Sequence, residues 1–226
     1  MTVTIVIMEG GVCLSSLSPN RDIPMLVEKI KINRESGDKT YPIWLLVNPK
    51  HPAVRHYIWT PVLAEIQDKV YREIRQRIDT TNIYIRNAVS DSRIVPNTLS
   101  WWGAEVAAEI ESFRESVLEY KPKILITFGA FPFEFMRRVN EIKPEKGPKS
   151  WGTSNLKNEF VKSINNFDIN KTNRIPLLRR VIESGKFVEN ENNLSQINVE
   201  DYFHFAGTKI AEKIIEHKDR FDLWIE

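Results

Sequence analysis

Four runs of the sequence place amide, glycine and guanidinium groups directly after apolar segments. The first is Asn48-Pro49-Lys50-His51, and Asn87, Gly129 and the pair Arg179-Arg180 follow the other three. A side-chain amide both donates and accepts hydrogen bonds, and a guanidinium group binds anions through paired donors. Glycine lets the backbone approach a ligand closely. Together these groups are suited to recognising a polar ligand and stabilising an anion.

The apolar segments that precede these residues have the length and composition of buried parallel strands. Residues 43–47, 83–89 and 123–128 are the clearest, 174–178 is a fourth, and 2–8 is a further candidate at an edge. The clear segments are short, rich in β-branched or aromatic residues, and followed by turn-forming residues. Ligands of open parallel sheets bind beyond the carboxyl ends of the strands. The four runs are therefore expected to converge on one cleft.

Helical periodicity fills the intervals between the predicted strands. Apolar residues recur every four positions from Val62 to Ile78, every three or four from Val106 to Val117, and again from Phe203 to Ile214. Alternating strands and helices predict βα units and a largely parallel sheet. We expect an α/β fold in a single domain over residues 1–226.

The segment 144–173 differs in composition, with five lysines and six asparagines in thirty residues. Loops of this length in a compact domain are usually functional or disordered. Leu156, Phe160 and Ile164 recur every four residues, which predicts a short helix inside the segment. We interpret it as a partly ordered, Lys/Asn-rich insertion.

Composition excludes several classes of protein. Cys13 is the single cysteine among 226 residues, so an internal disulfide, a CxxC zinc pair and a four-thiolate iron-sulfur site are impossible. The sequence has no phosphate-binding GxxxxGK[ST] loop, no GxGxxG, no HExxH and no GxSxG. It suggests no metal site and no cofactor. Without a secretory signal or an apolar stretch of roughly 20 residues, the protein is expected to be cytoplasmic.

The formal charge of +2 conceals an uneven distribution. Residues 121–186 hold fourteen Lys or Arg against six Asp or Glu, between an acidic predicted helix and an acidic tail. A polarised surface is expected, and the basic part favours a local contact with nucleic acid.

The order of these motifs resembles the uracil-DNA glycosylase superfamily. The resemblance rests on residues 83–89, with Asn87, on the Lys-Pro-Lys strand at 121–130, with Gly129, and on Asn48-Pro49. It implies a three-layer α/β/α sandwich around a central four-stranded, mostly parallel sheet. It also implies an enzyme that flips a deaminated base out of DNA and hydrolyses its N-glycosidic bond.

The resemblance also implies roles for single residues. Asn48 would position the water, Asn87 would bind the edge of the base, and Tyr57, or Trp59, would stack on it. The candidate catalytic residues are therefore Asn48, His51 and Arg179. The candidates for base binding are Asn87, Tyr57 and Gly129, and those for binding DNA phosphates are Lys50 and Arg180.

Two positions depart from the family pattern. Arg179 stands where the family usually has His, and Lys50 where it commonly has Gly. Arginine can stabilise an anion and bind phosphate, so the chemistry would be altered.

Other interpretations remain open. Asn48-Pro49 also fits a simple turn, Asn87 a loop cap, and Arg179-Arg180 a surface pair. A catalytically inactive nucleic-acid or nucleotide-binding protein of the same fold is the main alternative function. A third is an interaction protein that uses its acidic tail and tryptophans.

Overall fold

The computed structural model describes residues 4–8, 11–15, 35–47, 55–90, 104–140, 150–179 and 199–225. Side chains are described from residue 35 onwards, except at 55–57, 104–105 and 199–201. The chain divides into two compact units, residues 1–34 and residues 35–226.

The first unit contains a β-hairpin. Strand β1 (Thr4–Met8) pairs antiparallel with β2 (Gly11–Ser15), with Thr4 opposite Ser15 and Met8 opposite Gly11. The prediction that residues 2–8 add an edge strand is wrong about the partner, because β1 belongs to this two-stranded sheet. Only two residues separate β1 from β2 in the sequence, a spacing typical of tight hairpins. Pairing with this neighbouring segment costs less chain entropy than pairing with a distant strand, because the connecting loop is short.

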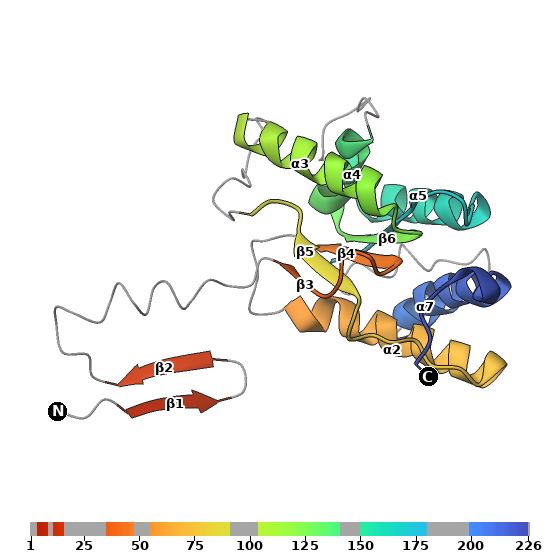
Figure 1. Ribbon diagram of the computed structural model, residues 1–226, viewed down its shortest axis with the longest axis horizontal. Coiled ribbons are helices and arrows are strands. Elements are labelled where there is room, and N and C mark those ends of the chain that lie inside the picture. Colours follow the sequence, from red (N-terminus) through yellow and green to blue (C-terminus); the bar gives the residue numbers. More distant parts are fainter. Residues whose placement is uncertain are drawn as a thin grey trace. The chain divides into compact units, whose positions relative to one another are not determined.

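The second unit is built on a five-stranded, mostly parallel sheet (Figure 1). Its order is β3 (Glu35–Ser36), β5 (Tyr84–Asn87), β4 (Ile43–Val47), β6 (Ile124–Phe128) and β7 (Asn173–Leu177). Strand β4 pairs in parallel with β5 and β6, and β6 pairs in parallel with β7. The α/β class is confirmed. The sheet has five strands, not the four predicted, because the two-residue β3 adds antiparallel to β5.

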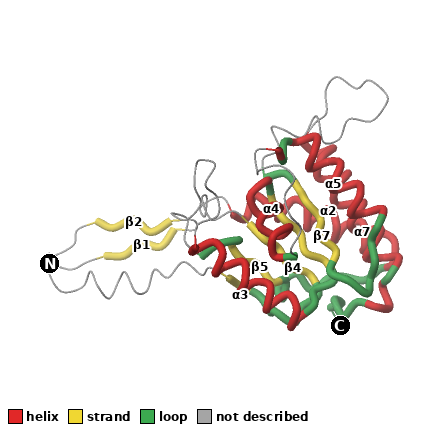
Figure 2. Tube along the Cα trace, turned by 90° about the horizontal axis from the view of Figure 1, so that it is seen from above, coloured by secondary structure: helices red, strands yellow, loops and turns green. Residues whose placement is uncertain are grey.

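Helices lie on both faces of this sheet. In Figure 1, α3 (Ala104–Tyr120) and α4 (Ala130–Val139) lie on one side, and α2 (Arg55–Ile74) and α7 (Val199–Glu216) on the other. Helix α5 (Thr153–Asn165) packs against β7, and a short 3-10 turn, η5 (Lys218–Arg220), follows α7. Figure 2 shows the same elements from above. The predicted helices thus form, but α4 was not predicted.

Alternation along the strands gives the sheet two apolar faces. Along β4, Ile43, Leu45 and Val47 belong to the core formed with α2, α5 and α7. Trp44 and Leu46 belong to the core formed with α3 and α4. Successive side chains of a strand point to opposite faces, so a wholly apolar strand is the pattern of a strand covered on both sides.

The helix predicted inside the segment 144–173 is confirmed as α5. Leu156, Phe160 and Ile164 are buried and join the main core. The described part of the segment, residues 150–173, therefore contributes to the core of the second unit.

The predicted helix 62–78 ends earlier than its periodicity suggests. Helix α2 stops at Ile74, and Arg75 has a φ of 58°. Ile78 instead forms an isolated bridge with Trp224 near the carboxyl end. Ile78 is nevertheless buried, so the periodic pattern identified its burial correctly but not its backbone conformation.

Helices α2 and α7 approach closely at Gly207. A Cβ at Gly207 would lie 2.5 Å from the Cβ of Glu65 and 3.3 Å from the carbonyl oxygen of Val62. Real Cβ atoms do not come so near, and a Cβ cannot rotate away. The contact between the helices therefore requires glycine at this position.

Gly207→Ala should lower the free energy of unfolding by about 1 kcal/mol, because the separation of two packed helices outweighs the better helix propensity of alanine. Urea denaturation measures the change. Gly152→Ala is the control, since nothing lies within 4 Å of its added Cβ, and it should change stability less. A Gly207→Ala protein as stable as the wild type would contradict this account of the contact.

Candidate functional site

Three of the predicted site residues are described with their side chains: Asn87, Gly129 and Arg179. Asn48, Lys50, His51 and Arg180 lie outside the described residues. The backbone of Tyr57 belongs to the first turn of α2, but its side chain also lies outside them.

The three described residues share the carboxyl edge of the parallel strands. Asn87 ends β5 and pairs with Val47, the last residue of β4. Gly129 follows β6, and its N–H donates to the carbonyl oxygen of Leu177 at 2.7 Å. Arg179 comes two residues after the end of β7. Asn87, Gly129 and Arg179 therefore lie at one edge of the sheet. The convergence of all four runs on one cleft stays a prediction.

Strand spacing sets the distance between these groups. Strand β4 separates β5 from β6, so the backbones at Asn87 and Gly129 lie about 10 Å apart, two strand spacings. A ligand bound beyond the end of β4 would therefore have Asn87 on one side and Gly129 on the other.

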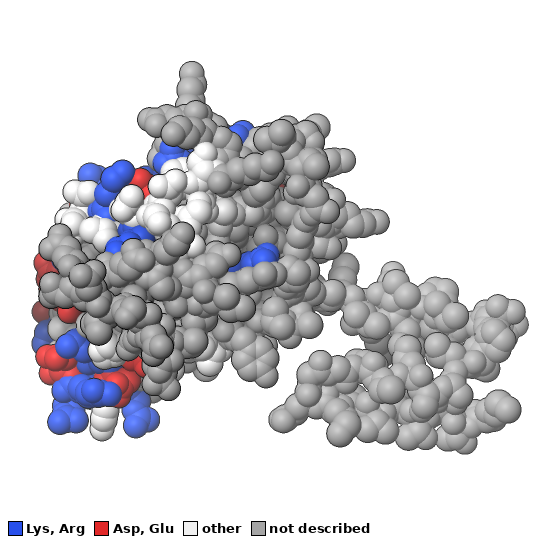
Figure 3. Space-filling model, turned by 180° about the vertical axis from the view of Figure 1, so that it is seen from behind, with Lys and Arg blue, Asp and Glu red and all other residues white. Residues whose placement is uncertain are grey.

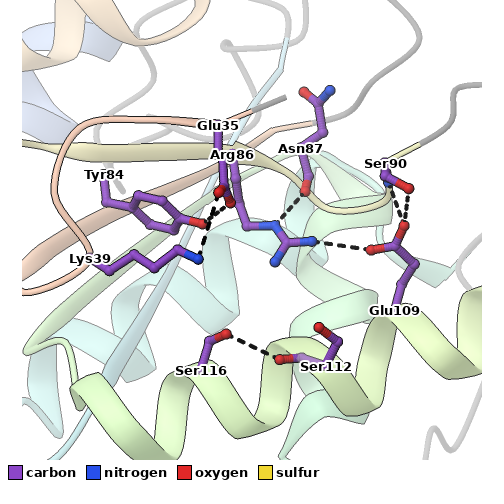
Figure 4. Close-up of polar contacts among 9 residues, drawn as sticks. All are labelled: Glu35, Lys39, Tyr84, Arg86, Asn87, Ser90, Glu109, Ser112 and Ser116. Carbon is purple, nitrogen blue, oxygen red and sulfur yellow. Dashed lines mark hydrogen bonds and ion pairs between the residues drawn. The ribbon is translucent and has the colours of Figure 1, made fainter. Parts of the chain in front are cut away.

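Asn87 is a buried amide whose acceptor has no partner among the described residues. Its side chain is 6% exposed, and its Oδ1 has no hydrogen-bond partner among the described residues. Figure 4 shows the side chain pointing away from Arg86 and Glu109. It lies on the same face of β5 as Ile85, which packs on the α2 and α7 side. A buried polar atom without a partner costs about 1–3 kcal/mol, so its presence requires an explanation.

Gly129 joins β6 to α4 in a conformation that favours glycine. Its φ is 93°, and a Cβ added there would lie 3.1 Å from the Cβ of Arg179. Helix α4 begins at the next residue without a side-chain cap. The amino-terminal N–H groups of a helix carry partial positive charge, so α4 and Arg179 make this part of the edge favourable to an anion.

The exit of β7 is fixed by a buried hydrogen bond. The N–H of Leu178 donates to the hydroxyl of Tyr202 on α7 at 2.8 Å. Tyr202 is 1% exposed, and burial raises the pKa of its hydroxyl, which stays neutral. This contact holds the backbone that leads directly into Arg179.

Sequence reasoning missed the ionic network that holds the exit of β5 (Figure 4). Nη2 of Arg86 donates to Oε2 of Glu109 on α3 at 3.2 Å, and Nε of Arg86 donates to the carbonyl oxygen of Asn87 at 3.1 Å. The other carboxylate oxygen of Glu109 accepts from both the N–H and the hydroxyl of Ser90. Arg86 also lies over the ring of Phe113, 4.8 Å from its centre. The network therefore fixes the chain on both sides of Asn87, at Arg86 and at Ser90.

A second polar contact fixes the outer side of β5. The hydroxyl of Tyr84 donates to Oε2 of Glu35 on β3, and Lys39 lies 3.6 Å from the same carboxylate. The Tyr84 hydrogen bond lowers the pKa of Glu35, and burial raises the pKa of Tyr84. Glu35 is thereby ionised and Tyr84 neutral at pH 7.

Thr127 is another buried polar residue near the end of β6. It is 0% exposed, and its Oγ1 has no hydrogen-bond partner among the described residues. Leu125, two residues earlier, packs with α3 and α4, so Thr127 lies on the opposite face of the sheet from Asn87. The two unpaired atoms therefore do not belong to one pocket.

The described surface carries an uneven charge distribution. In Figure 3, basic and acidic side chains mix at the lower left, and basic ones predominate in the upper described part. The mixing agrees with the ion pairs three or four residues apart on α2 and α7, such as Lys69–Glu73 and Lys213–Glu216.

No family model and no curated protein matches the sequence. Among the described residues, no group of three or more His, Cys, Asp or Glu side chains is placed to hold a metal ion. None of the helices in the described ranges is both long and apolar enough to cross a membrane.

Glu109→Gln should lower the free energy of unfolding by about 1–3 kcal/mol, because an amide turns a donor towards Arg86 or Ser90 and leaves a charge unpaired. Urea denaturation measures this change in the free energy of unfolding. Glu115→Gln, on an exposed position of the same helix, should change stability by less than about 0.5 kcal/mol. Equal effects of the two substitutions would contradict the role assigned to Glu109.

Proposed function

We propose that the protein is a DNA glycosylase, similar to the uracil-DNA glycosylase superfamily, that hydrolyses the N-glycosidic bond of a deaminated base flipped out of DNA. The observation that carries the proposal is the buried Asn87 amide, whose Oδ1 has no partner among the described residues. The three-layer sandwich of that superfamily is part of the proposal, and helices on both faces of the sheet support it.

Uracil matches the hydrogen-bonding groups of Asn87. Oδ1 can accept from N3–H of uracil while Nδ2 donates to O4, so one amide satisfies both groups. Cytosine presents an acceptor and a donor at these positions and would need the amide reversed. The network of Arg86, Glu109 and Ser90 would hold Asn87 in the orientation that selects one base.

The rest of the edge is suited to the charge that the reaction develops. Breaking the bond between C1′ and the base leaves the electron pair on the base and positive charge on the sugar, and a water oxygen then bonds to C1′. The water gives up a proton as the base becomes neutral. Arg179 and the amino end of α4 would stabilise the departing base anion, and Asn48, which follows β4, would position the water.

An assay with an oligonucleotide containing one uracil tests the proposal. The wild type should release the base and leave an alkali-labile abasic site, in single-stranded DNA or opposite guanine. Asn87→Ala should slow excision by about 100-fold or more, the effect of removing a hydrogen bond made to the developing anion. Asn87→Asp should also lose uracil excision, because a carboxylate has no donor for O4.

Asn155→Asp is the matched control, because it makes the same amide-to-carboxylate change at an exposed position on α5. It should leave excision unchanged. A wild type that leaves uracil, and other deaminated bases, intact would contradict the enzymatic proposal. Binding of DNA that weakens steeply with salt and yields no product would instead support the inactive binding protein.

A further inference from the structure

A cavity of about 310 Å³ lies between α4, α5 and the start of β7. Its charged lining consists of four cations and two carboxylates: Arg137, Lys162, Lys171, Arg174, Glu159 and Asp168. The lining therefore has an excess of two positive charges. An excess of this size in one cavity calls for an anionic ligand.

The two carboxylates are already used by the lysines. Lys162 lies 2.7 Å from Glu159, and Lys171 lies 3.2 Å from Asp168. The lysine pairs leave Arg137 and Arg174, and Arg137 has a carboxylate of its own, because Oε2 of Glu134 lies 3.6 Å from its Nε.

Arg174 carries most of this excess. Among the described residues it has no ion pair within 4.0 Å, and it is only partly exposed. Burial and the charge of Arg137 lower its pKa, and Glu159 opposes them. Two arginines that repel each other beside a cavity would both gain from an anion between them.

Contacts with Trp151 and Glu134 hold the side chain of Arg137 in place. Its Cζ lies 4.8 Å from the centre of the Trp151 ring, and Phe133 meets the same ring edge-on at 4.9 Å. Glu134, 0% exposed, accepts from Trp151 at 2.8 Å and from Arg138 at 3.1 Å, and lies 3.6 Å from Nε of Arg137. That buried Nε has no hydrogen-bond partner among the described residues. Trp151 and Glu134 thus position the guanidinium group of Arg137 beside the cavity.

We propose that this cavity binds a phosphate monoester, with Arg137 and Arg174 as its principal ligands and Lys171 at its rim. A phosphate monoester carries a charge of about −1.5 to −2 at pH 7, which matches the excess in the lining. Guanidinium groups bind phosphate oxygens in pairs, and Thr172, whose side chain carries a hydroxyl donor, is also a lining residue. The volume also has room for part of the molecule that bears the phosphate.

This site is distinct from the carboxyl edge that contains Asn87. Arg174 is the second residue of β7, whereas Arg179 follows its carboxyl end, so the two lie about 16 Å apart along the strand direction. The inference goes beyond the proposed base excision. The phosphate has two possible sources, a free nucleotide or the phosphorylated end of a nucleic-acid strand.

Calorimetric titration tests the site with inorganic phosphate, with a deoxynucleoside 5′-monophosphate, and with one oligonucleotide that has or lacks a 5′ phosphate. The wild type should bind the phosphorylated probes in the millimolar range or tighter. Arg174→Gln should weaken that binding about ten-fold or more, the effect of losing charge-assisted hydrogen bonds. Stronger binding of the phosphorylated oligonucleotide would identify strand ends as the source, and binding of the mononucleotide alone would identify free nucleotides.

Lys209→Gln is the charge-matched control, because Lys209 pairs with Glu212 on the exposed surface of α7, and it should bind phosphate as the wild type does. Lys171→Gln changes a side chain that is 78% exposed, so it should fold normally and still weaken binding. The proposal is overturned if the wild type binds none of the phosphorylated probes, or if Lys209→Gln weakens binding as much as Lys171→Gln and Arg174→Gln. Asn87→Ala should retain phosphate binding, which separates failure of this site from failure of base excision.

Discussion

The parallel pairing of β4 with both β5 and β6 is the constraint on which the candidate site depends. All five residues of β4 are buried, alternating between the two cores. Their burial fixes the register, because a slip of one residue would exchange the two faces. The register in turn brings the ends of β5, β6 and β7 to one edge. Asn87, Gly129 and Arg179 share that edge because the strands run in the same direction.

One partly buried carboxylate, one buried carboxylate and one tyrosine hold the elements around this sheet in place. Glu109 connects α3 to the chain after β5, and Glu134 connects α4 to Trp151. Tyr202 connects α7 to the end of β7. A carboxylate shielded from water is stable only with several donors, so the contacts of Glu109 and Glu134 each favour one arrangement of their neighbours. Within the described part of the chain, buried atoms of Asn87, Thr127 and Arg137 lack a hydrogen-bond partner, in contrast to these paired groups.

The sequence predicted most of the regular elements and missed those whose local pattern was ambiguous. Strands β4 and β6 are short apolar runs, and α2 and α3 have clear helical periodicity, so both kinds were recognised. Helix α4 was missed because Phe131, Phe133 and Phe135 alternate with other residues as in a strand. Its helical conformation depends on packing against β6 and α3. Tertiary contacts override local preference where the local signal is weak.

By itself, the sequence determined the α/β class and the kinds of group that follow the strands, because both depend on residues that are neighbours in the chain. It also excluded an internal disulfide and thiolate metal clusters, since Cys13 stands alone. Only the tertiary structure decided that Oδ1 of Asn87 has no partner among the described residues and that Arg137 and Arg174 line one cavity. These facts depend on which distant segments pack together. Residue types reveal what a side chain can do, but its partners are set by the packing of helices and strands that are remote in the sequence.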